Sequence, residues 1–184
     1  MQRIKTIFRI WLPFVVVITA FCGLGYASVQ QAYRQGANDP QIQMAEDAAA
    51  ALANGGNADA VVPANRVSVD QSLAPFLIVY DTKGTVLASS AMLDGQTPGL
   101  PDGVLDSARQ MGEDRITWQP RDGVRIAAVI VPYQNGFVLA GRSLREVESR
   151  VDQLTTFTGL TWLLSVAATL AVIAFGEFFL AEKK

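Results

Sequence analysis

The sequence contains no histidine and a single cysteine, Cys22, among its 184 residues. Without histidine the chain cannot form a Ser-His-Asp triad, a Cys-His dyad, a His-ligated zinc site or a phospho-accepting histidine. One cysteine cannot form a disulfide within the chain. Cys22 lies in the most apolar stretch, where cysteine usually behaves as a small buried hydrophobe. No other group of residues has the pattern of an enzyme site, so we expect no catalytic activity.

Charged residues are also scarce, at 17% of the chain, while half of all residues are apolar. The net charge of −2 provides no basic field for nucleic acid, so we expect no nucleic-acid partner. Residues 34–152 hold 10 basic and 15 acidic side chains, a net charge of −5. These acidic residues do not form the D-x-D-x-D-G loop of a calcium site. We therefore expect no metal and no cofactor.

Two long runs contain no charged residue at all, residues 10–33 and residues 153–176. A helix of about 20 apolar residues crosses the ~30 Å hydrocarbon core of a bilayer. Aromatic residues lie toward the ends of both runs, as they do at membrane interfaces. We predict transmembrane helices over residues 10–33 and 153–177, with the aromatic residues Trp11, Tyr26, Tyr33, Trp162, Phe178 and Phe179 at their ends.

Basic residues lie before the first run and after the second, at the two ends of the chain. Arg3, Lys5 and Arg9 precede the first, and Lys183 and Lys184 follow the second. By the positive-inside rule we expect both termini to be cytoplasmic, and we expect the chain to be a two-pass protein of the bacterial inner membrane. The first run also resembles a signal peptide, but it is longer than the usual apolar region and no A-x-A site follows, so we expect no cleavage. The predicted segments are a cytoplasmic N-terminus (1–9), an extracytoplasmic domain (34–152) and a cytoplasmic tail (178–184).

The extracytoplasmic region begins with a predicted helix, Gln41–Ala53. Asp39 can cap its free N–H groups, and Pro40 suits the first helical position. Spacings of three, four and three residues give the helix a narrow apolar stripe. Its members are Ile42, Ala45, Ala49 and Leu52.

From Phe76 onward the pattern is typical of β-strands. Phe76–Tyr80 and Thr85–Ser89 flank the turn sequence D-T-K-G and predict a hairpin. Asn135-Gly136 is the strongest hairpin signal in the sequence. It joins the predicted strands Val124–Tyr133 and Phe137–Gly141. A further strand is predicted over Arg115–Gln119. A short helix is predicted to begin at Asp102 or Asp106 and to end at Met111. The predicted fold class is therefore α+β, with an antiparallel sheet of about five strands and flanking helices.

A second helical stripe precedes the second apolar run, and no helix breaker separates the two. The stripe could pack against the chain's own sheet. Alternatively it could form a stalk that pairs with a second copy, which we favour because the stripe is narrow. We therefore expect a homodimer with a stalk formed by Leu144, Val147, Val151 and Leu154.

Two segments resemble a known family. Residues 76–90 (FLIVYDTKGTVLASS) resemble the opening hairpin of extracytoplasmic PAS-like (Cache or PDC) sensor domains, and residues 136–148 (GFVLAGRSLREVE) look like their last strand and the following helix. A PAS-like domain between two membrane helices is the arrangement of bacterial two-component sensor kinases. Within the 184 residues nothing matches the dimerisation and ATP-binding domains of those kinases. The resemblance thus implies a sensor module without catalytic output.

A ligand of such a domain would be held by polar side chains on the sheet. Arg125 and Tyr133 share one face of their strand by its period of two, and Arg115 and Trp118 lie on the neighbouring strand. These four residues could hold an anionic or polar small molecule. Alternatively, Arg125 is a solvated surface residue and Trp118 belongs to the core.

Three functions fit these features. The first is a sensor that passes its signal to a separate kinase or regulator through the membrane helices. The second is an accessory or structural subunit of a larger inner-membrane complex, and a third is a remnant of a kinase gene. We favour the sensor. A kinase or response regulator encoded next to the chain would favour it further, whereas co-purification with a stoichiometric membrane assembly would favour the second.

Overall fold

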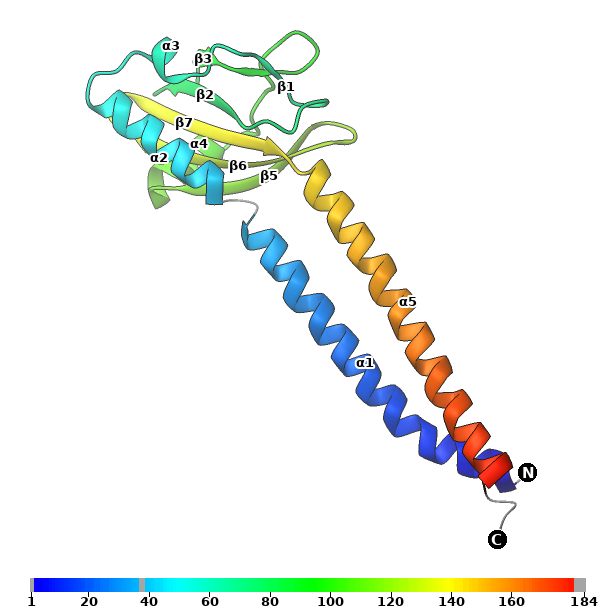
Figure 1. Cartoon of the computed structure of the whole chain (residues 1–184). Helices are drawn as coiled ribbons and strands as arrows, with labels where there is room; N and C mark the ends of the chain where they lie inside the picture. Colours follow the sequence, from blue (N-terminus) through cyan, green and yellow to red (C-terminus); the bar gives the residue numbers. More distant parts are fainter. Residues whose placement is uncertain (1, 37–38, 181–184) are drawn as a thin grey trace. The chain divides into compact units, whose positions relative to one another are not determined.

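Two long helices and one five-stranded sheet dominate the chain, of which a computed structural model describes residues 2–36 and 39–180 (Figure 1). The chain divides into two units. Residues Met1–Tyr33 and Ser149–Lys184 form the first, which contains most of both long helices. Residues Arg34–Glu148 form the second, which contains the sheet.

The long helices are α1 (Gln2–Gly36) and α5 (Arg145–Phe175), and a π-helical turn (Gly176–Leu180) follows α5. Both are long and apolar enough to span a membrane, over Arg3–Tyr33 and Arg145–Phe179. No residue in the most apolar part of either helix is buried within the chain. Apolar side chains that the protein leaves uncovered are the surface that lipid would cover.

Three hydrogen bonds connect α1 to α5 at successive levels along the helices. Polar groups in such helices gain from bonding to each other, because lipid offers them no partner. The aromatic residues that were expected as interfacial anchors therefore also join the two helices. The pairs are Trp11 Nε1 to the Val166 carbonyl oxygen (3.1 Å), Trp162 Nε1 to Thr19 Oγ1 (2.9 Å), and the hydroxyls of Tyr26 and Thr155 (3.2 Å).

The second unit is built around one antiparallel sheet with the strand order β3-β2-β7-β6-β5. Four hairpin or long-range pairings hold it together, and each pair of neighbours is antiparallel. The predicted antiparallel sheet of about five strands is confirmed. Its strands are β2 (Phe76–Asp81), β3 (Val86–Ser89), β5 (Asp114–Arg121), β6 (Val124–Tyr133) and β7 (Gly136–Ser143).

Three short elements were not predicted from the sequence. Strand β1 (Val67–Ser68) pairs in parallel with β4 (Ala91–Met92), and α3 (Ala58–Val61) is a single helical turn. Strands of two residues are too short to show a period, so the sequence offers no signal for them.

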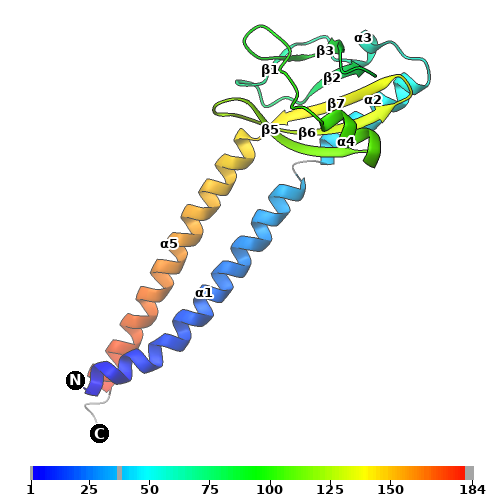
Figure 2. The same cartoon turned by 180° about the vertical axis from the view of Figure 1, so that it is seen from behind.

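Helices cover both faces of the sheet, α2 (Asp39–Ala53) on one and α4 (Val104–Met111) on the other. Helix α2 lies in front of the sheet in Figure 1, and α4 lies in front when the molecule is seen from behind (Figure 2). Side chains of β2 alternate between the two covered faces, which explains its unbroken apolar sequence. Phe76, Ile78 and Tyr80 belong to the core under α4, while Leu77 and Val79 pack with α2.

The start of α4 differs from the predicted cap. Helix α4 begins after Gly103, which has a positive φ of 81° and forms no side-chain cap, so neither Asp102 nor Asp106 acts as the N-cap. The predicted cap at Asp39 concerns a side chain outside the part of the chain that the structure describes.

The apolar stripe of α2 packs within the chain, because Ala45, Ala49 and Leu52 are buried against the sheet.

The β6–β7 hairpin has a two-residue turn formed by Gln134 and Asn135, since Tyr133 pairs with Gly136. Gly136 is therefore the first residue of β7 and not part of the turn. Its φ is not in the left-handed region, so the glycine serves a different purpose. A Cβ at this position would lie 1.9 Å from the Tyr80 carbonyl oxygen, which means that β2 approaches too closely for any side chain.

Candidate functional site

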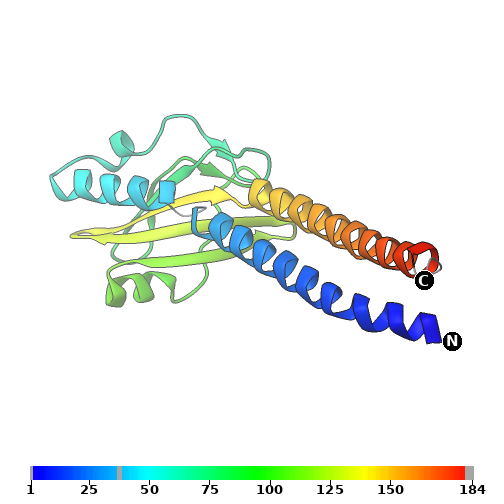
Figure 3. The same ribbon diagram turned by 60° about the horizontal axis from the view of Figure 1, so that its bottom comes forward.

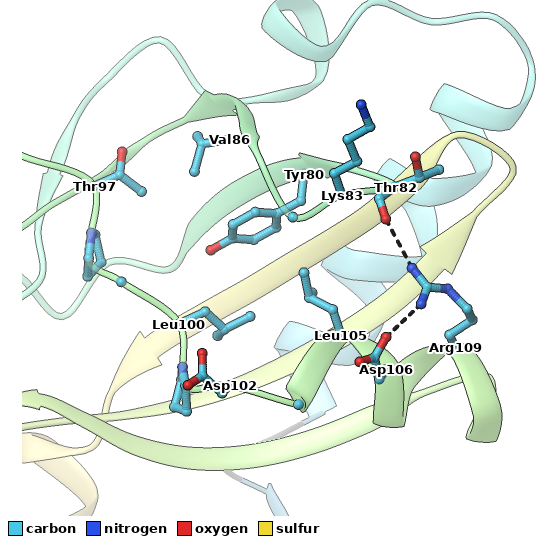
Figure 4. Close-up of a pocket in the computed structure, with 15 residues that line it drawn as sticks. Tyr80, Thr82, Lys83, Val86, Thr97, Leu100, Asp102, Leu105, Asp106 and Arg109 are labelled. Carbon is cyan, nitrogen blue, oxygen red and sulfur yellow. Dashed lines mark hydrogen bonds and ion pairs between the residues drawn. The ribbon is translucent and has the colours of Figure 1, made fainter.

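A cleft of about 410 Å³ opens beside the end of β2 (Figure 4). Three segments form its walls: the β2–β3 turn, the glycine- and proline-rich segment 97–103, and α4. Small-molecule sites in proteins typically occupy about 300–1,000 Å³. The side chains drawn in Figure 4 show a mixture of aliphatic and polar groups, with Val86, Leu100 and Leu105 among the aliphatic ones.

The Tyr80 side chain projects into this cleft from the end of β2 (Figure 4). Tyr80 is 4% exposed, and no group among the described residues forms a hydrogen bond with its hydroxyl. Most buried hydroxyls in proteins have such a partner, so this one requires an explanation. Burial raises the pKa of Tyr80 to about 12, so the hydroxyl stays neutral at physiological pH and can both donate and accept.

The arginine beside the cleft is paired within the protein. Arg109 Nη1 lies 2.6 Å from Asp106 Oδ1, its Nη2 donates to the Thr82 carbonyl oxygen (3.1 Å), and its guanidinium lies 5.0 Å from the centre of the Phe137 ring. The Lys83 side chain points away from the Tyr80 hydroxyl (Figure 4). The geometry thus offers a neutral hydroxyl rather than an unpaired cation to a bound molecule.

Segment 97–103, one wall of the cleft, is attached to β5. Trp118 is 7% exposed and belongs to the core under α4. Its Nε1 donates to the carbonyl oxygen of Gly99, at 3.1 Å. Trp118 therefore holds one wall of the cleft in place from behind, without lining it.

The structure does not bring the four predicted ligand residues together. Arg125 forms an ion pair with Glu148 (2.5 Å) and Tyr133 packs on the α2 face, whereas Trp118 lies in the core on the opposite face. Arg115 is half exposed and pairs with Glu113. Of these residues none lines the cleft.

Sequence reasoning did not identify Tyr80 as a functional residue. It ends an apolar strand, and the sequence alone indicates a core position for it. The signal that could have identified the cleft is the run T-P-G-L-P-D-G at residues 97–103, which cannot form regular structure and must loop over the end of the sheet.

The junction between β7 and α5 is a second region of interest besides the cleft. Strand β7 runs directly into α5 (Figure 3). Leu144 is the one residue between them. Several bonds fix the first turn of α5 to the sheet unit. They are Arg145 to the carbonyl oxygens of Asp70 (3.1 Å) and Gln71 (2.6 Å), Arg125 to Glu148 (2.5 Å), Arg142 to Glu146 (3.2 Å), and Leu144 N to the Arg125 carbonyl oxygen (2.9 Å).

The four predicted stalk residues lie at and beyond this junction. Leu144, Val147, Val151 and Leu154 are all half-buried within the single chain. Their stripe is thus partly covered by the chain itself, and pairing with a second copy stays a prediction.

Comparisons with known proteins found no match for the chain. No protein-family model, curated protein or solved structure matches it. Within residues 2–36 and 39–180, no group of three or more Cys, Asp or Glu side chains could hold a metal ion.

Proposed function

We propose that the chain is a membrane-anchored sensor module whose extracytoplasmic sheet domain binds a small polar molecule. The observation that carries this proposal is the unpartnered hydroxyl of Tyr80 in a cleft of about 410 Å³. A bound molecule would supply the missing hydrogen bond and occupy the cleft. The module has no catalytic output of its own and passes its signal to a separate membrane partner.

The chain's architecture supports this proposal. Two helices that are long and apolar enough to span a membrane precede and follow the sheet domain in the sequence. A five-stranded antiparallel sheet with a helix on each face is compatible with the PAS-like sensor fold that residues 76–90 and 136–148 resemble. The positive residues near the N-terminus favour an extracytoplasmic position for the domain.

The chemistry of the cleft indicates an uncharged ligand. Arg109 already has a carboxylate partner, and the Tyr80 hydroxyl is neutral at physiological pH. An anionic ligand would find Arg109 already paired, and burying a charge without a partner is unfavourable. A hydroxylated molecule gains a hydrogen bond to Tyr80 and apolar contact with Leu100 and Leu105.

Thermal unfolding of the full chain in detergent tests the proposal. The probes are a panel of uncharged hydroxylated compounds (polyols, monosaccharides, nucleosides) and a panel of carboxylates. We expect at least one uncharged compound to raise the Tm, because a ligand at 100 times its Kd stabilises the folded state by about 2.7 kcal/mol. Tyr80→Phe should bind that compound about twofold to tenfold more weakly, since it lacks one hydrogen bond.

The matched control is Tyr133→Phe, which removes a tyrosine hydroxyl from the opposite face of the same sheet. This variant should respond to the compound as the unmodified chain does. Equal Tm shifts in all three proteins would show that the compound binds elsewhere. A response to carboxylates alone would contradict the uncharged ligand.

A further inference from the structure

Arg121, at the end of β5, is bonded to two carboxylates that belong to distant parts of the chain. Its Nη1 lies 2.5 Å from Asp94 Oδ1 and its Nη2 lies 3.1 Å from Asp70 Oδ2. Asp94 precedes Arg121 by 27 residues, and Asp70 precedes it by 51. One guanidinium thus joins three segments, of which the Asp70 and Asp94 segments are also linked by the pairing of β1 with β4.

The first of these segments leads into the cleft. Asp94 lies in the turn that Leu93 and Gln96 close with two backbone hydrogen bonds (2.7 and 3.0 Å). Its φ of 51° is unusual for a residue other than glycine, so the turn is held in one specific conformation. The cleft-lining segment 97–103 follows directly, and a shift in that segment therefore reaches Asp94.

The second segment leads to α5. The backbone carbonyl oxygens of Asp70 and Gln71 both accept hydrogen bonds from the Arg145 guanidinium, at 3.1 and 2.6 Å. Arg145 is the first residue of α5. Ser68 Oγ donates to the Asp70 carboxylate (2.7 Å), and this bond, together with Arg121, lowers the pKa of Asp70 below its usual value. The carboxylate therefore stays charged at neutral pH, and its bond to Arg121 persists.

We propose that Arg121 couples the cleft to the membrane helix, by bonding at once to the Asp94 turn beside the cleft and to the Asp70 segment that holds Arg145. The inference rests on the proposed function, because it assigns a regulatory connection to the same cleft. A ligand that moves segment 97–103 shifts Asp94, and the shift passes through Arg121 and Asp70 to the first turn of α5. Helix α5 continues from there to Phe175 without interruption.

Hydrogen–deuterium exchange of the full chain in detergent, without any ligand, tests this coupling separately from binding. Arg121→Gln should raise exchange about threefold to tenfold in two separate peptides, residues 94–103 and residues 144–150, which reflects the loss of two exposed ion pairs. Because coupling is reciprocal, Arg145→Gln should also raise exchange in residues 94–103.

The matched control is Arg115→Gln. Arg115 lies on the same strand and forms an exposed ion pair with Glu113, but that pair connects neither segment. This variant should leave both peptides unchanged. If Arg121→Gln alters residues 94–103 and not residues 144–150, or if Arg145→Gln acts on α5 alone, the coupling is absent. Ligand-dependent Tm shifts would still stand in that case, so the two proposals can fail independently.

Discussion

Replacing Gly136 by alanine is expected to unfold the sheet domain. The added Cβ would lie 1.9 Å from the Tyr80 carbonyl oxygen and 2.9 Å from its carbonyl carbon. Both are backbone atoms of β2, one strand in from the sheet edge, so relief requires β2 and β7 to separate. We expect a loss of about 4 kcal/mol or more, a large part of the 5–15 kcal/mol that stabilises a typical domain.

The measurement is urea unfolding in detergent of a chain that carries Trp11→Phe and Trp162→Phe, so that Trp118 alone reports on the domain. Gly99→Ala is the control, because a Cβ there meets no atom within 4 Å. That variant should retain the stability of the parent chain. A Gly136→Ala domain that unfolds at the parent urea concentration would show that β2 and β7 are not paired in this register.

Truncation of Trp118 should have the second largest effect. Trp118→Ala removes a buried aromatic side chain and leaves a cavity, which costs about 3–5 kcal/mol. Trp118→Phe keeps most of the packing but loses the hydrogen bond to Gly99, which costs about 1 kcal/mol. Pulse proteolysis in urea measures the stability of both variants.

The same pair of variants distinguishes the two roles considered for Trp118. A core residue produces the large loss on truncation to alanine. Truncation of a residue that faces a ligand would reduce the stability of the domain only slightly when no ligand is present. A loss of less than about 1 kcal/mol in Trp118→Ala would therefore place Trp118 outside the core and contradict the description of the cleft wall.

The sheet was largely predictable because its strands carry strong local signals. The apolar run Phe76–Tyr80 matches β2 to within one residue. The long run Val124–Tyr133 coincides with β6. Turn chemistry was less informative. Asn135-Gly136 correctly indicated a hairpin, but the glycine is required by the approach of β2, a contact between residues more than fifty positions apart.

The candidate site was not predictable for the same reason. The cleft depends on the end of β2, the loop 97–103 and α4 meeting in space, and no local period records that meeting. The sequence drew attention to Arg125 because it shares one face of its strand with Tyr133, yet its guanidinium pairs with Glu148 at the start of α5. Pairings of this kind link segments of the fold and become visible only in three dimensions.

The proposed function requires that the Tyr80 cleft face the outside of the cell, and cysteine labelling in intact cells tests this most directly. Lys83, exposed on the rim of the cleft, is replaced by cysteine in a Cys22→Ser chain, and Glu177→Cys serves as the control at the other end of α5. A membrane-impermeant maleimide should label position 83 in intact cells whose outer envelope is permeable. It should label position 177 only after the inner membrane is broken. Labelling of position 177 with protection of position 83 would place the cleft in the cytoplasm and contradict the proposed function.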